Sequence, residues 1–363
     1  IFNGNFINGV GFRSAPNYDL TWYTATTANA GIDLTLWDGK LGVTADIFQR
    51  DREGLLGYQV LTIPGIVGAD LPQENLNSDR HRGYEISLSH RNRVNDFAYN
   101  ISANIAYTYS MTRDYARSTL GNSYSNWRNN NANRYNEIWW GVESTGVFTS
   151  YDQIYNSTVN YGNGNMEHLP GDYIYEDWNG DGVIDGNDNH PIATRNNSPR
   201  INGGLTFSAE YKGIDMSLLL QGAAMSYVEY PEQLSTPFVW QNGNILSMFL
   251  DRWHPEDPEA DRYDPNTKWV AGSRPALGRP IGTGTAVVRD ASYLRVKSME
   301  IGYSLPKQWL NKLTIAGMRV YVNAYNLLTF TGIKYLDPEH PSDSYGYLYP
   351  INRTYNVGIL INL

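Results

Sequence analysis

An aspartate-rich segment between residues 177 and 188 carries side chains whose types and spacing suit a metal ion. A hard dication takes about six or seven oxygen ligands, and alternate residues of a tight turn can direct their side chains inward. Gly182 stands where such a loop must bend sharply. The residues at the ligand positions of an EF-hand loop are Asp177, Asn179, Asp181, Val183, Asp185 and Asp188. We therefore predict a calcium ion with a structural role, the ordering of the long loop around it.

The same segment also fits a surface loop that binds no metal. Asp and Asn side chains form Asx turns with the neighbouring backbone without any ion. The flanking sequence lacks the two helices of an EF-hand, and Asp188 replaces the bidentate Glu of that motif, which should weaken calcium binding. The loop occurs once, whereas a dockerin module would need a duplicated loop. Both interpretations stay open at this point.

A stretch rich in aromatic residues is a second candidate for ligand contact. Its rings could stack on sugars or on peptide side chains, and the neighbouring asparagines add hydrogen-bonding groups. The same rings could instead pack under a covering protein or in the core of the loop. The candidates for substrate contact are Trp127, Tyr135, Trp139 and Trp140.

Other ionisable residues show no spacing that predicts catalysis. Glu256, Asp257, Glu259 and Asp261 could act as an acid–base pair, as in glycosidases, but the prolines among them favour a solvated loop. The 6 histidines are dispersed and form neither a metal-ligand nor a triad pattern. We therefore predict that the protein is not an enzyme.

The elements that must position these residues are β-strands with alternating apolar and polar side chains. Between Phe97 and Tyr109 the odd positions are mostly aromatic or aliphatic, and the even positions are small or polar. The apolar phase switches near Ser298, which predicts a β-bulge. The expected strands are 28–37, 40–52, 80–92, 97–111, 201–211, 214–226, 290–304, 315–329 and 350–363.

The connections between these strands alternate strictly between short and long. Asp38-Gly39 and Lys212-Gly213 are tight turns, whereas 53–79, 112–199 and 227–289 are long links. Outer-membrane barrels have short turns on one side and long loops on the other, and a soluble sandwich has no reason for this parity. We predict an all-β fold, an antiparallel transmembrane β-barrel, with residues 112–199 as a long extracellular loop region. Nine strands are too few and odd in number, so we expect further strands upstream.

The composition agrees with a barrel in an outer membrane. The chain has 28 Tyr and 10 Trp, which suit aromatic girdles at the membrane interfaces, and no Cys. No apolar run reaches the about 18 residues of a membrane helix. The net charge of -9 and the lack of a basic stripe argue against a nucleic-acid partner. The first residues show neither a start Met nor a signal peptide, so we interpret the sequence as a fragment or a mature portion.

Several segments, in order along the chain, resemble the SusC/RagA-like class of TonB-dependent outer-membrane transporters of Bacteroidetes type. Tyr23 replaces the usual Glu after Trp22, and Leu363 replaces the usual terminal aromatic residue. The segments are Asn17–Trp22 with Gly31–Asp33, Thr145–Ser150, Pro170–Tyr173, Asp177–Asp185, Asp251–Glu256, Asp290–Lys297, Asn326–Phe330 and Asp337–Glu339. The resemblance covers about residues 17 to 363 and implies that residues 1–363 are the C-terminal portion of a barrel of about 22 strands.

The resemblance also implies partners and a function. It implies a plug domain, absent from this chain, and a SusD-like lipoprotein lid. It implies energy from TonB through the missing N-terminal part. We expect a multi-pass protein of the bacterial outer membrane, surrounded by lipid and lipopolysaccharide, that imports an oligosaccharide or oligopeptide. The alternatives are a surface adhesin or binding barrel without active transport and, third, a soluble all-β glycan-processing enzyme.

Overall fold

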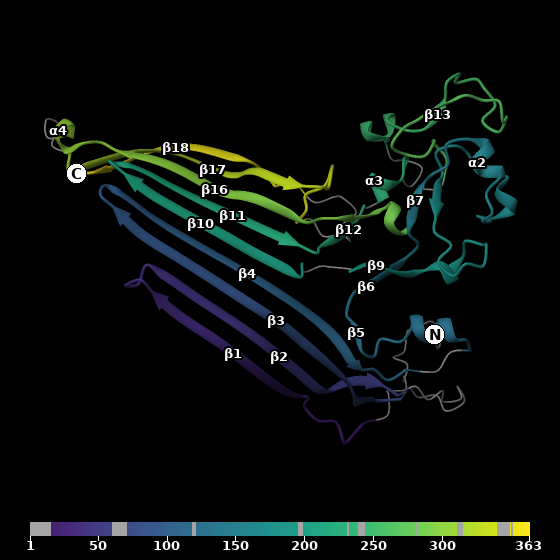
Figure 1. Ribbon diagram of the computed structural model, residues 1–363, viewed down its shortest axis with the longest axis horizontal. Helices are drawn as coiled ribbons and strands as arrows, with labels where there is room; N and C mark the ends of the chain where they lie inside the picture. The colour runs from purple at the N-terminus through teal and green to yellow at the C-terminus, as the bar shows by residue number, and fades with distance from the viewer. Residues whose placement is uncertain are drawn as a thin grey trace, which may run out of the picture. The chain divides into compact units, whose positions relative to one another are not determined.

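Antiparallel strands dominate the computed structural model of the chain (Figure 1). It describes residues 16–59, 71–117, 121–194, 199–230, 232–238, 244–279, 282–310, 315–339, 349 and 351–363. The helices in these ranges are short, and none combines the length and apolarity needed to cross a membrane. Residue 350, the first of the expected final strand, lies outside the described residues, as do parts of the long connections.

The main sheet contains nine long strands. Their order in the sheet is their order along the chain, so neighbours among the nine are paired. A tenth, short strand, Arg134–Tyr135 (β5), pairs with the end of β4. The nine expected strands are thereby confirmed. They are Thr24–Leu36 (β1), Leu41–Tyr58 (β2), Gln73–Val94 (β3), Phe97–Asp114 (β4), Ile201–Tyr211 (β10), Ile214–Ala224 (β11), Tyr293–Ser304 (β16), Gly317–Thr331 (β17) and Thr354–Asn362 (β18).

Two details predicted from the sequence occur where expected. Lys212 and Gly213, between β10 and β11, have φ values of 46° and 85°, as in a tight type I′ hairpin turn. Against β11, Val296 and Ser298 pair with the adjacent residues Leu220 and Leu219, which leaves Lys297 as the bulged residue of β16. The predicted bulge near Ser298 is therefore confirmed.

The apolar side chains of the sheet lie exposed rather than packed against a second sheet. Ile32 in β1 is 60% exposed and Val357 in β18 is 76% exposed. In a soluble protein such a surface would be unstable, whereas lipid covers it in a membrane barrel. The soluble sandwich considered from the sequence is therefore the wrong architecture.

Polar side chains on the alternate positions form a ladder across β11, β16 and β17. The Arg319 guanidinium donates to Asp215 and, over 2.7 Å, to Glu300. Asn323 continues the ladder with a 3.2 Å bond to the second oxygen of Glu300. Gly302 leaves room for this guanidinium, since an added Cβ would lie 2.4 Å from the Arg319 Nη2. One face of the strands is thus adapted to charge and water.

The long connections are ordered by short ribbons and helices. Ile138–Gly141 (β6) pairs with His190–Thr194 (β9), and Ser144–Val147 (β7) pairs with Tyr173–Tyr175 (β8). Tyr227–Glu229 (β12) pairs with Val288–Asp290 (β15), and His254–Pro255 (β13) with Trp269–Val270 (β14). The helices are Ser123–Arg128 (α1), Tyr151–Tyr155 (α2), Glu232–Ser235 (α3) and Lys307–Leu310 (α4). Single 3-10 turns occupy Asn163–Asn165, Gly186–Asp188, Ser247–Leu250 and Gly284–Ala286.

The chain divides into two compact units. One comprises Ile1–Gly31, Asp46–Tyr84 and Thr108–Asn136; the other comprises Ile32–Ala45, Glu85–Tyr107 and Glu137–Leu363. In the second unit a buried cluster of Phe148, Tyr151, Ile154 and Leu169 packs within the connection between β4 and β10. This long connection therefore has a hydrophobic core of its own.

Candidate functional site

The aspartate-rich segment folds into a closed loop around the carboxylate of Asp177. Its Oδ1 accepts hydrogen bonds from the amides of Gly180 (2.8 Å) and Asp181 (3.1 Å), and its Oδ2 accepts one from Gly182 (2.8 Å). Gly180 and Gly182 have φ values of 74° and 83°, which side chains with a Cβ rarely adopt. The predicted bend at Gly182 is therefore present, and the first ligand position is fixed by the backbone.

Asp188 closes the other end of the loop. Its side chain is fully buried, with an exposed fraction of 0%. It accepts hydrogen bonds from the amides of Trp178 (3.0 Å) and Asp185 (2.7 Å), which tie the end of the loop to its beginning. Asn179 donates over 2.9 Å to Asp181, whose other oxygen accepts the amide of Val183. These Asx turns form with or without an ion, so the geometry fits both interpretations of the sequence.

The four aromatic candidates are divided between the two units. In the first unit, Trp127 lies on α1, and the Arg134 guanidinium carbon is 5.1 Å from the centre of the Trp127 ring. The rings of Tyr135 and Tyr109 form an edge-to-face contact, with their centres 5.3 Å apart. In the second, Trp139 and Trp140 are neighbours on β6, half-buried, and pair with Ala193 and Pro191 of β9. Trp127 and Tyr135 are more exposed, at 39% and 46%. Substrate contact by these rings stays a prediction.

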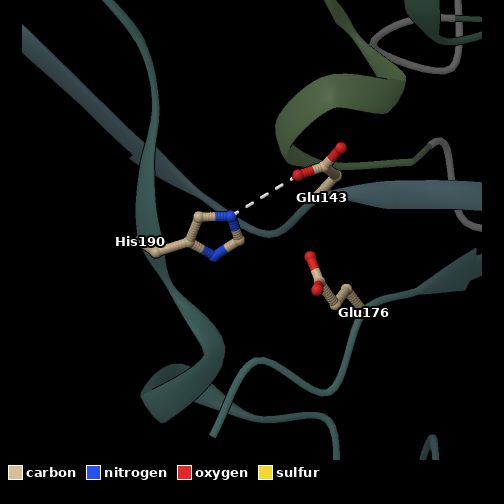
Figure 2. Close-up of side chains that lie close together, drawn as sticks. All are labelled: Glu143, Glu176 and His190. Atoms are coloured by element: carbon tan, nitrogen blue, oxygen red, sulfur yellow. Dashed lines mark ion pairs between the residues drawn. The ribbon is translucent and has the colours of Figure 1, made fainter.

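A group of metal-ligand type side chains that the spacing did not reveal lies beside the aspartate-rich loop. Glu143, Glu176 and His190 place their ligating atoms within 4.8 Å of one another. Figure 2 shows the His190 ring pointing toward the two carboxylates. The three residues are far apart in the sequence and only strand pairing brings them together, so no local motif could have indicated them.

Asp172 is a buried acidic residue with several polar partners. Its buried carboxylate accepts from Arg279 Nε and Nη2, the latter over 2.5 Å, and from the amide of Leu169. His168 Nδ1 lies 3.1 Å from the same carboxylate. Burial alone would raise the pKa of Asp172, but the hydrogen bonds from His168 and Arg279 outweigh it and hold the pKa below its usual value. Asp172 therefore stays ionised and anchors Arg279.

Gly171 brings two further segments close to the ion pair of Asp172 and Arg279, which is the first of two anchors in the loops. Its φ is +95°, and an added Cβ would lie 2.3 Å from Cγ of Trp253. Its amide donates to the carbonyl of Phe148 over 2.7 Å, and the Phe148 amide donates back to the carbonyl of Asp172. Segments around residues 148, 171 and 253 thus meet at one point, although the sequence separates them widely.

A second anchor holds the connection that follows β17. Arg295 of β16 is almost fully buried and forms ion pairs with Asp337 (2.7 Å) and Glu339 (2.6 Å). Its guanidinium also lies 5.5 Å from the ring centre of Tyr293. A buried Arg with two carboxylates fixes the path of the chain beyond the strand.

Sequence comparison finds relatives along almost the whole chain. A TonB-dependent receptor, P3, of Formosa agariphila is 27% identical over 354 residues, 92% of this chain and 32% of the relative. The TonB-dependent receptor SusC of Bacteroides thetaiotaomicron is 25% identical over 355 residues, 94% of this chain and 32% of SusC. No family model matches the sequence. The chain thus spans about a third of the length of these relatives.

The chain is similar in sequence to SusC-type TonB-dependent receptors. The solved RagAB peptide transporter shares its fold, with a TM-score of 0.67 at 21% identity over 98% of this chain and 38% of that one. The nine-stranded sheet is accordingly part of an antiparallel outer-membrane β-barrel. The predicted outer-membrane location is confirmed.

Several of the segments that carried the SusC-type resemblance meet in the structure at the two anchors. Pro170–Tyr173 contacts Thr145–Ser150 through the Phe148 backbone and Asp251–Glu256 through Trp253. Asp290–Lys297 contacts Asp337–Glu339 through Arg295. These segments therefore hold loop residues together as well as a strand and the loop that it contacts.

Proposed function

We propose that the chain is part of a TonB-dependent importer that moves an oligomeric nutrient across the outer membrane. The observation that carries this proposal is the similarity to TonB-dependent receptors over 92 to 98% of the chain, which includes the loops as well as the strands. The polar ladder around Arg319 supports it, because a transport path needs a wetted face on the strands. Import proceeds by gated passage and not by chemistry on the nutrient.

The proposal includes a plug domain, supplied by sequence outside this chain, and a SusD-like lipoprotein that covers the extracellular loops. The nutrient is an oligopeptide or an oligosaccharide. The RagAB structure is described as a peptide transporter, which supports the first of these classes. The exposed rings of Trp127 and Tyr135 are the proposed contacts in the first unit, and Trp139 and Trp140 those in the second.

Uptake measurements in the native host test this proposal. Cells with and without the tonB gene receive labelled oligopeptides or labelled oligosaccharides, and surface binding is measured separately from uptake. We expect deletion of tonB to abolish uptake of one class while its surface binding persists. Equal uptake in both strains contradicts the importer and favours an adhesin or binding barrel. Co-purification of the full-length protein in detergent tests for the lipoprotein lid.

A calcium ion in the aspartate-rich loop is the second part of the proposal. Asp177, Asp181, Asp185 and Asp188 place four carboxylates within one closed loop, and a dication offsets their repulsion. Burial of the Asp188 charge adds to the need for a cation, because a buried charge is costly unless it is paired. The ion would use the predicted ligands, with the backbone oxygen of Val183, and would order the surrounding loop.

Chelation tests for this calcium ion. Hydrogen exchange of residues 170–190 is compared in the full-length protein with calcium and after dialysis against a chelator. We expect chelation to speed exchange in the natural protein and to have little further effect in Asp181→Ala. Asp152→Asn, an exposed change on α2 outside the loop, is the control. Unchanged exchange together with no calcium in elemental analysis contradicts the site.

A further inference from the structure

We propose that Glu143, Glu176 and His190 form a second metal site, which binds a borderline divalent transition-metal ion of the Zn²⁺ type. Their ligating atoms converge, and His190 is 8% exposed while the two carboxylates reach the surface. The site does not rest on the importer function, and it shares no ligand side chain with the calcium loop, although Asp188 and Trp178 of that loop orient His190. Two features of the structure support it, the way the backbone places the three residues and the orientation of the His190 ring.

The backbone brings the three residues together at the corner between two ribbons. His190 begins β9 and pairs with Gly141, the last residue of β6. Glu143 lies between β6 and β7, directly before Ser144, and its carbonyl accepts the amide of Glu176 over 2.9 Å just beyond β8. Each ligand thus comes from a strand end whose position is fixed by backbone hydrogen bonds.

The two glutamates lie opposite each other on antiparallel segments. Like charges in that position repel and destabilise the pairing. No Lys or Arg among the described residues forms an ion pair with either carboxylate; the ion-pair contact of Glu143 is with His190 Nε2, 3.7 Å away. A dication between the two carboxylates removes the repulsion.

The His190 ring is held in the orientation of a metal ligand. Its Nδ1 lies 2.9 Å from the carbonyl oxygen of Asp188, which can only accept, so Nδ1 carries a proton. In the neutral ring the lone pair is then on Nε2, which faces the carboxylates (Figure 2). The Trp178 ring stacks on the imidazole at 5.2 Å with an interplanar angle of 11° and limits its rotation. Metal-binding histidines are oriented in this way by a carbonyl or carboxylate at the other nitrogen.

The ligand set selects the class of ion. Imidazole nitrogen suits zinc and its neighbours, whereas calcium takes oxygen ligands, so the site differs in preference from the aspartate-rich loop. Tetrahedral zinc with bonds near 2.1 Å needs ligand atoms about 3.4 Å apart. The present separation of up to 4.8 Å therefore requires a small inward rotation, which the 54% exposed Glu143 side chain can make. Water would fill the fourth position.

Zinc titration of the full-length protein tests the site. The protein is purified in detergent without a histidine tag, calcium is added to saturation, and zinc affinity is measured by competition with a chelating dye. We expect His190→Gln, Glu143→Gln and Glu176→Gln each to weaken one class of zinc site at least about tenfold, since even loss of an outer-shell partner costs 10–100-fold. Both glutamate changes lie at the surface and should leave the fold intact.

One control variant shows whether zinc binding depends on these three residues in particular. Glu167→Gln alters an exposed glutamate of the same connection, whose carboxylate accepts a hydrogen bond from Asn163. This variant should keep the zinc affinity of the natural protein. X-ray absorption of the zinc-loaded protein should show an imidazole ligand that His190→Gln removes. Equal zinc affinity in the natural protein and the three variants overturns the proposal and leaves His190 in contact with Glu143 without a metal ion.

Discussion

At the scale of single residues, Gly171 is a position where the loop architecture tolerates little change. A Cβ there meets a positive φ and the Trp253 ring at once. We expect Gly171→Ala to destabilise the connection by about 2–4 kcal/mol, from backbone strain and overpacking together. Limited proteolysis of the full-length protein should show faster cleavage near residues 145–175.

The matched control is Gly146→Ala on β7. This exposed glycine has open space around the added Cβ, so the change should leave the proteolysis pattern as it is. The heat-modifiable migration of the barrel should persist in both variants, because neither residue lies in the main sheet. Equal proteolysis of the two variants contradicts the role assigned to the contact with Trp253.

Protonation of Asp172 makes the stability of the same connection depend on pH. Because its pKa is lowered in the folded protein, its ionised form stabilises the loop above the pKa of an unfolded Asp, and this contribution disappears as the pH falls through the folded pKa. We expect Asp172→Asn to cost about 3 kcal/mol at neutral pH, since Arg279 loses its buried partner. Hydrogen exchange near residues 168–175 should rise on acidification below pH about 4 in the natural protein, and much less in the variant. An identical pH response of both proteins argues against the ion pair as the cause.

At the scale of elements, polar contacts stabilise the outer part of the hairpin of β2 and β3, that is, residues 51–58 and 73–80 next to the connection between the two strands. Arg52 donates to both oxygens of Asp79, and Arg80 donates to Asp51 over 2.5 and 3.0 Å. We expect Asp79→Ala to destabilise this outer part by about 2 kcal/mol, the worth of a hydrogen bond to a charged group. Hydrogen exchange of residues 73–80 should then accelerate, while residues 84–92 keep their protection.

Glu74→Gln serves as its control, because glutamine keeps an oxygen that can accept from Gln59. If hydrogen exchange accelerates as much in this control as in Asp79→Ala, any polar change destabilises the outer part of the hairpin. The prediction then loses its basis in the Arg52–Asp79 pair.

This hairpin also shows where inference from the sequence stops. Alternation of apolar residues predicted strands at 40–52 and 80–92, but β2 continues to Tyr58 and β3 begins at Gln73. The added residues pair through Arg, Asp, Asn and Gln side chains, which carry no apolar period. The membrane-facing strands follow from the sequence because lipid requires a regular apolar face, whereas the polar extensions depend on partners in another strand.

The candidate sites show the same division. The aspartate-rich loop was predictable, because its hydrogen bonds join residues within one short segment, and its fold depends on local Asp and Gly chemistry. The group of Glu143, Glu176 and His190 was not, since two ribbons must form before the three side chains meet. The anchors of Asp172 and Arg295 are equally non-local; their segments were noticed through family resemblance, not through any pairing visible in the sequence.

At the scale of the whole molecule, the sheet of this chain is one part of a barrel. Within the described residues, β1 and β18 stand at the two ends of the strand order, each paired with one neighbour. A strand edge exposed to lipid leaves backbone groups without partners, which costs several kcal/mol for each group. We therefore expect further strands to pair with both ends.

Residues 1–363 expressed alone with a signal peptide should fail to form a heat-modifiable, membrane-inserted species, whereas the full-length protein should form one. Co-expression of the remaining sequence as a separate chain should restore part of the folded form, because the missing strands then supply the partners of β1 and β18. A folded, membrane-embedded monomer of residues 1–363 alone would show instead that the two ends can pair with each other.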